Sequence, residues 1–104
     1  MLGLRQHCRV VGDSMHPTIK SGDTLIYIPL KEKIHLLKKG NMVVIEHPQK
    51  QKTLLVKRIF KLDLPFLEVR GDNEFNSIDS RQFGFISIEN VIGIVEQIIP
   101  KNLD

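Results

Sequence analysis

The segment TLLVKRIFKL, residues 53–62, has the composition of a β-strand. Side chains along a strand point alternately to its two faces, so Lys57 shares a face with Leu55 and Ile59. Arg58 takes the opposite face. Similar segments, rich in β-branched residues and separated by Gly, Pro, Asn and Asp, recur along the chain at residues 8–11, 23–28, 42–47, 66–72, 83–88 and 91–99. This pattern predicts a mostly β protein, built as a small antiparallel β-barrel or folded sheet.

The length of the chain suits one folding unit. No linker and no internal repeat divides the sequence, so we expect a single domain over residues 1–104. Two places carry a helical signal: a short turn after Ser14, and residues 30–39, in which three aliphatic residues recur at helical spacing. Because Pro29 precedes the second segment and the segment is short, a loop lying on the sheet explains it equally well.

The charge of the chain is modestly positive, with a formal net charge of +3 at pH 7. Basic residues are bunched between Lys31 and Lys61, which is typical of a solvated basic face or of a surface that binds nucleic acid. The chain has one Tyr, five Phe and no Trp, and no basic run alternates with them as a base-stacking surface requires. We therefore expect no nucleic-acid partner, and a non-catalytic binding module is the less favoured alternative.

Composition also bounds the cofactors and the location of the protein. The single cysteine, Cys8, excludes an intramolecular disulfide. Cys8 and the four histidines have no spacing typical of a metal site, so we expect neither a metal nor another cofactor. No apolar run approaches the roughly twenty residues that span a bilayer, and residues 1–10 lack the apolar core of a secretion signal. These features predict a cytoplasmic protein without an integral membrane anchor and leave peripheral membrane contact open.

A second segment, VVGDSMHPTIKSGD (residues 10–23), places a serine in a tight turn. A serine that attacks a carbonyl needs a rigid exposed position, a base, and donors for the oxyanion. Gly12 permits an unusual backbone angle and Pro17 restricts the residue before it, so the turn suits Ser14 as a nucleophile. The alternative is structural: Asp13 or Ser14 caps a single helical turn.

The candidate base is a lysine, because none of the four histidines lies in a motif that pairs it with an acid. A lysine acts as a general base only when burial among apolar groups lowers its pKa well below its ordinary value of about 10.4. Lys57 lies between two aliphatic neighbours on its face of the strand and meets this condition. The alternative is that Lys57 extends its ammonium group to water at the sheet edge.

The third element is GDNEFNSIDSRQFG, residues 71–84, which is too polar for the interior of a strand. Its functional interpretation is that Ser77 or Ser80 supplies a hydroxyl that orients the neutral amine of a lysine toward the nucleophile. The alternative is a self-contained turn rich in Asx residues, in which Asp79 and Arg81 form an ion pair.

These motifs resemble, in order along the chain, the boxes of type I signal peptidases: GDSMHPT, SGDTLIYI, KKGNMVVI, LVKRI and GDNEFNSIDSRQFG. The resemblance covers most of the chain and extends to the self-cleaving domain of LexA-type repressors, which implies their shared β catalytic fold. It implies that Ser14 is the nucleophile, that Lys57 is the general base, and that Ser77 hydrogen-bonds the lysine amine. It implies a structural role for Asp79 and Arg81.

The oxyanion hole departs from the family pattern. Signal peptidases of bacteria commonly carry Ser or Thr two residues before the nucleophile as a side-chain donor, and this chain has Gly12 there. The resemblance implies one oxyanion donor, the N–H of Ser14. For the second donor we expect a backbone N–H around Gly12 and Asp13.

The resemblance implies an endopeptidase that binds a precursor in extended form and removes an N-terminal leader through an acyl-enzyme. Within the family, the chain is most similar to the small soluble proteases that mature nickel-type superoxide dismutase, so such a precursor is the expected substrate. Two alternatives stay open: general signal peptidase-like processing of other precursors, and a self-cleaving regulatory domain of the LexA or UmuD kind. The sequence makes no prediction of the oligomeric state.

Overall fold

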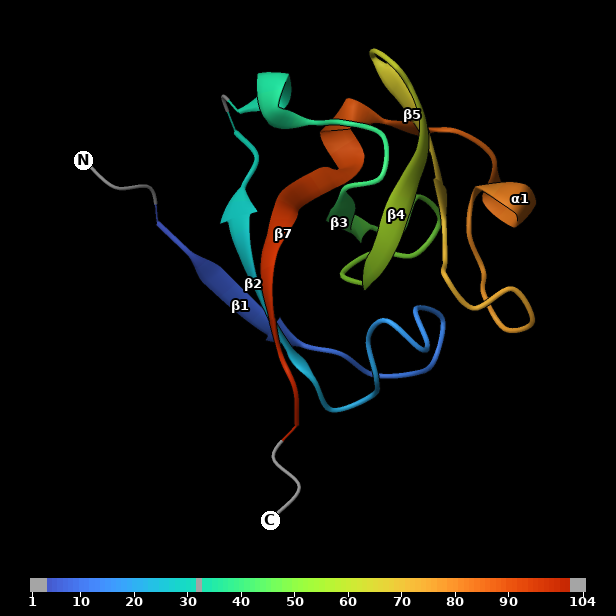
Figure 1. Cartoon of the computed structure of the whole chain (residues 1–104). Helices are drawn as coiled ribbons and strands as arrows, with labels where there is room; N and C mark the ends of the chain where they lie inside the picture. The colour runs from blue at the N-terminus through green and yellow to red at the C-terminus, as the bar shows by residue number, and fades with distance from the viewer. Residues whose placement is uncertain (1–3, 32, 102–104) are drawn as a thin grey trace.

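The computed structural model describes residues 4–31 and 33–101 and contains one curled antiparallel sheet of seven strands in the order β1-β2-β7-β3-β4-β5-β6 (Figure 1). The strands are β1 (Gln6–Arg9), β2 (Thr24–Pro29), β3 (Met42–Glu46), β4 (Leu54–Asp63), β5 (Phe66–Arg70), β6 (Ile86–Ser87) and β7 (Val91–Ile99). The helical elements are η1 (Ile34–Leu36), α1 (Ser80–Phe83) and η2 (Ile88–Asn90). The prediction of a mostly β fold with an antiparallel folded sheet is confirmed.

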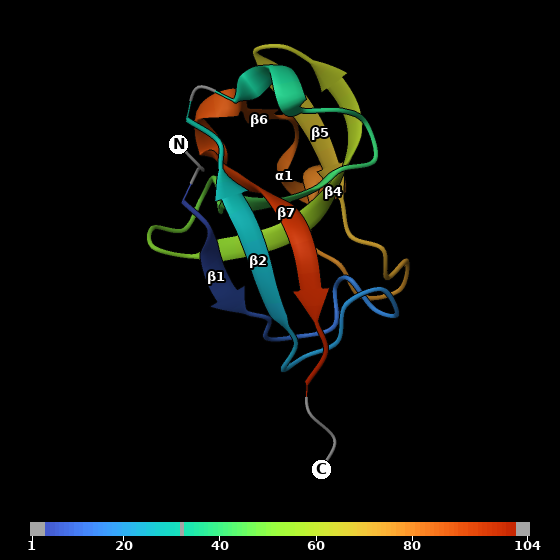
Figure 2. The same cartoon turned by 60° about the vertical axis from the view of Figure 1, so that its left-hand side comes forward.

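The last strand, β7, closes the centre of the sheet. It inserts between β2 and β3, pairing Thr24 with Ile99 on one side and Val43 with Ile94 on the other. Figure 2 shows β7 beside β2. The register shifts by a bulge in each of these two pairings, and bulges increase the local bend of a strand. Residue 93 of this strand has to be glycine, because a Cβ there would lie 2.5 Å from the Tyr27 ring. The sheet therefore curls around its buried apolar side chains.

The apolar residues that the structure describes form two separate buried clusters. The larger cluster lies among β3, β4, β5 and β7 and includes Val43, Ile59 and Val69. The smaller cluster consists of Met15, Ile19 and Leu25, with partly buried residues of β1, β4 and β7 packed against it. Because the smaller cluster takes two residues from the segment after Ser14, it anchors that segment to the sheet.

The helical elements differ from the sequence-based expectations. Among the described residues of 30–39, only the 3-10 helix η1 is helical, and the residues after Ser14 form hydrogen-bonded turns. The segment at 83–88 yields only the two-residue strand β6, because α1 extends to Phe83. This short helix was not predicted. Asp79 is its N-cap, and the side chains of Asp79 and Gln82 form a reciprocal capping box.

Candidate active site

The turn that carries Ser14 is held by a backbone hydrogen bond and by the buried side chain of Met15. The amide of His16 donates to the carbonyl of Asp13 at 3.0 Å, which leaves Ser14 and Met15 in the two central positions. Met15 is buried, packed with Ile19 in the smaller apolar cluster, while Ser14 is half-buried. The anchored methionine fixes the turn and leaves the serine at the surface of the fold.

Lys57 is buried, with only 1% of its surface exposed. It lies on β4 two residues before Ile59, which is also buried, as the alternation of the strand predicts. Burial lowers the pKa of the Lys57 amine, because the charged form loses its hydration; the positive charge of Arg81 lowers this pKa further, and the negative charge of Asp79 partly opposes both. The neutral amine is therefore favoured relative to a lysine in water.

Ser77 connects Lys57 to a carboxylate. Lys57 Nζ donates to Ser77 Oγ at 3.3 Å, and Ser77 Oγ donates to Asp79 Oδ2 at 2.8 Å. The direction is fixed because an ionised carboxylate can only accept, so the Ser77 proton points to Asp79 and the Ser77 lone pairs face Lys57. One N–H of the lysine amine is thereby used, and the nitrogen lone pair of the neutral amine is free for another proton.

Asp79 is completely buried and fully hydrogen-bonded. Its carboxylate accepts from the backbone amides of Gly71 (2.8 Å) and Arg81 (3.0 Å), and from the Arg81 guanidinium at 3.0 and 2.7 Å. Burial by itself raises the pKa of this carboxyl, but the hydrogen bonds from Arg81, Gly71 and Ser77 outweigh it and hold the pKa of Asp79 well below its ordinary range. The expected ion pair with Arg81 is present, and it balances the charge that faces Lys57.

The loop after β5 touches the serine turn directly. The Asn73 amide donates to the Ser14 carbonyl at 2.9 Å, and Asn73 Nδ2 donates to the Asp13 carbonyl at 3.0 Å. A Cβ on Gly71 would overlap Ser77 Oγ and lie 2.5 Å from the Ser14 carbonyl oxygen. Sequence reasoning missed Gly71; its position directly after a strand and before a polar loop is the available signal.

A second set of contacts joins the lysine strand to the same turn. Arg58, next to Lys57, forms a bidentate ion pair with Asp72 at 2.9 and 2.8 Å. Asp72 Oδ2 also accepts from Thr18 Oγ1 at 2.7 Å, and the Asp72 amide donates to Met15 Sδ at 3.3 Å. Sequence reasoning assigned no role to Arg58 or Thr18, although together they fix the serine turn against β4.

The proposed members of the site are brought together to different degrees. Lys57 and Ser77 are hydrogen-bonded, whereas Ser14 Oγ and Lys57 Nζ form no hydrogen bond with each other in the described part of the chain. The connection between Ser14 and Ser77 runs through the close approach at Gly71. The alternative hydroxyl, Ser80 Oγ, instead accepts from the buried amide of Val69 at 2.8 Å, so it supports the backbone of β5.

The backbone around the expected oxyanion hole is also defined. Gly12 has a φ of +96°, in the region that favours glycine, and its amide donates to Ser21 Oγ at 3.3 Å. Within residues 4–31 and 33–101, no protein group accepts from the amides of Asp13 and Ser14. These two N–H groups are thus available to an incoming oxygen.

Comparison with known protein families matches residues 2–62 and 66–99 to the family described as signal peptidase, peptidase S26. The chain belongs to this family. Membership implies a serine peptidase with signal peptidase-like processing activity, consistent with the resemblance of the sequence motifs. A comparison with curated proteins found no match. None of the helices in the described part of this S26 peptidase is long and apolar enough to cross a membrane.

Beside Ser14, this S26 peptidase has a cavity of about 170 Å³. One wall is the end of β1 and the residues that follow it, Cys8 to Val11; the other is Leu54 to Val56 of β4. Each wall carries a strand edge that lacks a partner among the described residues: β1 pairs only with β2, and β5 pairs with β4 only from Arg58 onward. Most residues that line the cavity are apolar, and Ser14 is one of the lining residues.

Proposed function

We propose that this S26 peptidase is a serine endopeptidase with a catalytic dyad of Ser14 and Lys57, which removes an N-terminal leader from a precursor protein. The observation that carries the proposal is the burial of Lys57 together with its hydrogen bond to Ser77. Without these two features the lysine would be an ordinary ammonium group, which cannot accept a proton.

Acylation begins with proton transfer from Ser14 Oγ to the neutral Lys57 Nζ while Oγ attacks the scissile carbonyl carbon. The negative charge develops on the carbonyl oxygen, and the N–H groups of Ser14 and Asp13 are the proposed donors for it. The resulting Lys57 ammonium gives its proton to the leaving amine as the peptide C–N bond breaks. Ser77 and Asp79 keep the Lys57 nitrogen oriented throughout, because their hydrogen bonds have a fixed direction.

Deacylation repeats the same proton transfers with water. Lys57, neutral again after the amine departs, takes a proton from a water molecule that attacks the acyl carbon. The second tetrahedral intermediate collapses, Ser14 Oγ leaves as the hydroxyl after receiving that proton, and the new carboxylate is released.

The precursor is proposed to bind as an added strand between the unpaired edges beside Ser14. The edge of β1 and the free part of β4 offer backbone donors and acceptors, and the apolar cavity of about 170 Å³ has room for small apolar side chains before the scissile bond. Binding of this kind recognises an extended leader by its backbone and a few side chains.

The precursor of a nickel-type superoxide dismutase is the substrate that we propose first, on the resemblance of the motifs to the soluble proteases that mature this enzyme. The test mixes the purified protein with a panel of precursors that includes this one and identifies new N-termini by mass spectrometry. We expect one new N-terminus with the wild type and none with Ser14→Ala or Lys57→Met.

Lys61→Met is the matched control, because Lys61 is an exposed lysine on the same strand and its loss should leave cleavage intact. Circular dichroism confirms that each variant is folded. Cleavage by a folded Ser14→Ala/Lys57→Met double variant would disprove the dyad. Cleavage of a different precursor by the wild type would leave the dyad in place and overturn only the proposed substrate.

A further inference from the structure

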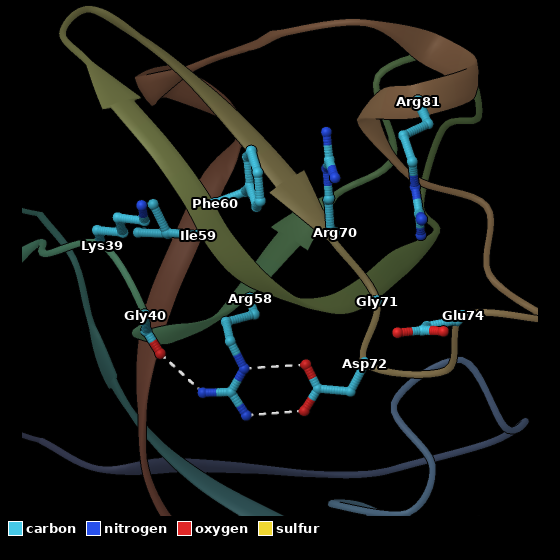
Figure 3. A pocket seen from close by; sticks show the side chains of 10 residues that line it. All are labelled: Lys39, Gly40, Arg58, Ile59, Phe60, Arg70, Gly71, Asp72, Glu74 and Arg81. Atoms are coloured by element: carbon cyan, nitrogen blue, oxygen red, sulfur yellow. Dashed lines mark hydrogen bonds and ion pairs between the residues drawn. The ribbon is translucent and has the colours of Figure 1, made fainter.

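A second cavity, of about 330 Å³, is lined in part by Gly71 and Asp72 of the loop that supports Ser14 (Figure 3). Its walls come from β4, from the end of β5, from the turn at Lys39 and Gly40, and from the polar loop and α1. Gly71 and Asp72 line this cavity and also contact the serine turn, Gly71 at the Ser14 carbonyl and Asp72 at Thr18. The proposed mechanism makes no use of the space itself.

The cavity is lined by more cations than anions. Four basic side chains and two acidic side chains face it. All three guanidinium nitrogens of Arg58 already donate, to Asp72 and to the Gly40 carbonyl, and the Asp72 carboxylate neutralises its charge. Among the described residues, the Arg70 guanidinium donates only to Glu68, through Nε and Nη2, and the Arg81 guanidinium donates only to Asp79, through the same two atoms. Each of these two arginines therefore retains a free Nη1.

Lys39 adds a third available cation. Within residues 4–31 and 33–101 it has no ion-pair partner, and its Nζ lies 5.6 Å from the centre of the Phe60 ring. The Arg70 guanidinium stacks on the same ring with its central carbon 3.6 Å from the ring centre. Phe60 is 42% exposed and lines the cavity, so the two cations beside its ring stay close to solvent.

This combination suits a carboxylate on a short aliphatic stem. Guanidinium groups with free N–H donors bind carboxylates in the plane of the fork, and a nearby ammonium adds charge. The exposed part of the Phe60 ring provides an apolar surface for the methylene groups of the same side chain. A volume of about 330 Å³ has room for one or two amino-acid side chains.

We propose that this cavity binds an acidic side chain of the polypeptide that the enzyme cleaves. The inference rests on the proposed peptidase function. Gly71 and Asp72 line the cavity and also contact the serine turn, so the cavity lies next to that turn rather than on a remote surface. Binding there selects precursors that carry Asp or Glu at a fixed distance from the scissile bond.

Removing the charge of Glu74 should change the affinity for an acidic side chain in the direction opposite to removing Lys39 or Arg70. Its carboxylate lines the same cavity and lies in the field of Arg81, yet it has no ion-pair partner in the described part of the chain (Figure 3). An incoming carboxylate meets repulsion from Glu74, so Glu74→Gln should strengthen binding. Loss of Lys39 or Arg70 should weaken binding. A purely structural role of these residues would not produce this pair of opposite effects.

The first experiment measures binding without cleavage. The full chain carrying Ser14→Ala is titrated by NMR with acetyl-Gly-Glu-Glu-Glu-Gly-amide and with the peptide in which Gln replaces each Glu. We expect saturable shifts at Phe60 and Arg70 with the Glu peptide only. Lys39→Gln/Arg70→Gln should weaken this binding about fivefold to thirtyfold, and Lys50→Gln, an exposed charge outside the cavity, should leave it unchanged.

The second experiment measures cleavage specificity with a peptide library and the wild-type enzyme. A preference for Asp or Glu at one position should disappear in Arg70→Gln and fall in Arg70→Lys, which keeps the charge but not the fork. Equal binding of the Glu and Gln peptides, or shifts caused by inorganic phosphate but not by the Glu peptide, would overturn the proposal. If the library is never cleaved, the peptidase function fails, while the titration still decides whether the cavity takes carboxylates.

Discussion

Ser77 Oγ accepts a hydrogen bond from Lys57 Nζ at 3.3 Å and donates its own hydrogen bond to Asp79 Oδ2 at 2.8 Å. The buried carboxylate of Asp79 can only accept, so the direction of both bonds follows from its ionisation. Lys57 is therefore oriented by a hydroxyl that cannot compete with Ser14 for the nitrogen lone pair. The negative charge of Asp79 favours the ammonium form of Lys57, and the ion pair of Asp79 with Arg81 limits this effect.

Removing the Ser77 hydroxyl should lower activity more than stability. Ser77→Ala leaves Lys57 without its oriented partner, so we expect kcat to fall about tenfold to hundredfold with little change in the urea midpoint. Ser80→Ala is the matched comparison, because it deprives the buried Val69 amide of its acceptor and should cost about 1–3 kcal/mol of unfolding free energy. The same loss of kcat in both variants would contradict the separate roles of the two serines.

Gly71 should tolerate no side chain. A Cβ there overlaps Ser77 Oγ and lies 2.5 Å from the Ser14 carbonyl, so Gly71→Ala must separate the serine turn from the lysine. We expect cleavage to fall at least about a hundredfold and stability to fall by about 1–3 kcal/mol, as for an overpacked core. Gly40→Ala is the contrasting variant: it introduces backbone strain without overlap, since the φ of Gly40 is +94° and a Cβ there would meet nothing within 4 Å. An active Gly71→Ala enzyme would show that the close approach is not required.

Lys57→Met should stabilise the protein while abolishing its activity. The folded state lowers the pKa of Lys57, so the unfolded chain binds more protons between that lowered pKa and the ordinary value of 10.5. The unfolding free energy of the wild type should therefore rise with pH across this window. Lys57→Met removes the burial penalty, so it should be more stable at pH 7 and its stability should change less with pH. Urea unfolding between pH 6 and 10 measures both effects, and a less stable Lys57→Met protein would contradict a buried, destabilised amine.

Asp79 should account for much of the loss of stability in acid. Its folded pKa lies below the ordinary value of 3.8, so its contribution is complete above that value and is lost as the pH falls below it. Asp79→Asn should cost about 2–3 kcal/mol at pH 7, because the Arg81 side chain and the Gly71 amide lose a charged acceptor. It should also flatten the decline in unfolding free energy between pH 5 and 2. An acid decline as steep as that of the wild type would assign it to other carboxyl groups.

Local patterns in the sequence predicted much of the fold. The alternation in residues 53–62 identified β4 and the buried face of Lys57, because a period of two is a property of the strand alone. The insertion of β7 between β2 and β3 was not predictable in the same way. Strand order depends on long-range packing, and no local pattern in residues 91–99 specifies its neighbours.

The candidate site also combines features that local patterns predict with features that depend on long-range packing. The burial of Lys57 follows from the alternation within one segment, and its contact with Ser77 was expected from the family resemblance. The ion pair of Arg58 with Asp72 and the bond from Thr18 join different segments and were not expected. The residues of the polar loop alone do not separate Ser77 from Ser80, and only the resemblance to signal peptidases favoured Ser77. The structure distinguishes them, because the hydroxyl of Ser80 is used by the backbone of β5.

The central claim is that Lys57, as a neutral amine, takes the proton of Ser14. The most direct measurement is the single-turnover rate of cleavage of the identified precursor as a function of pH, between pH 6 and 10.5. The rate should rise through one ionisation with a midpoint below the ordinary lysine value of 10.5 and then reach a plateau, because burial lowers the pKa of Lys57. A flat profile over this range, or the same rise in Lys57→Met, would contradict the account.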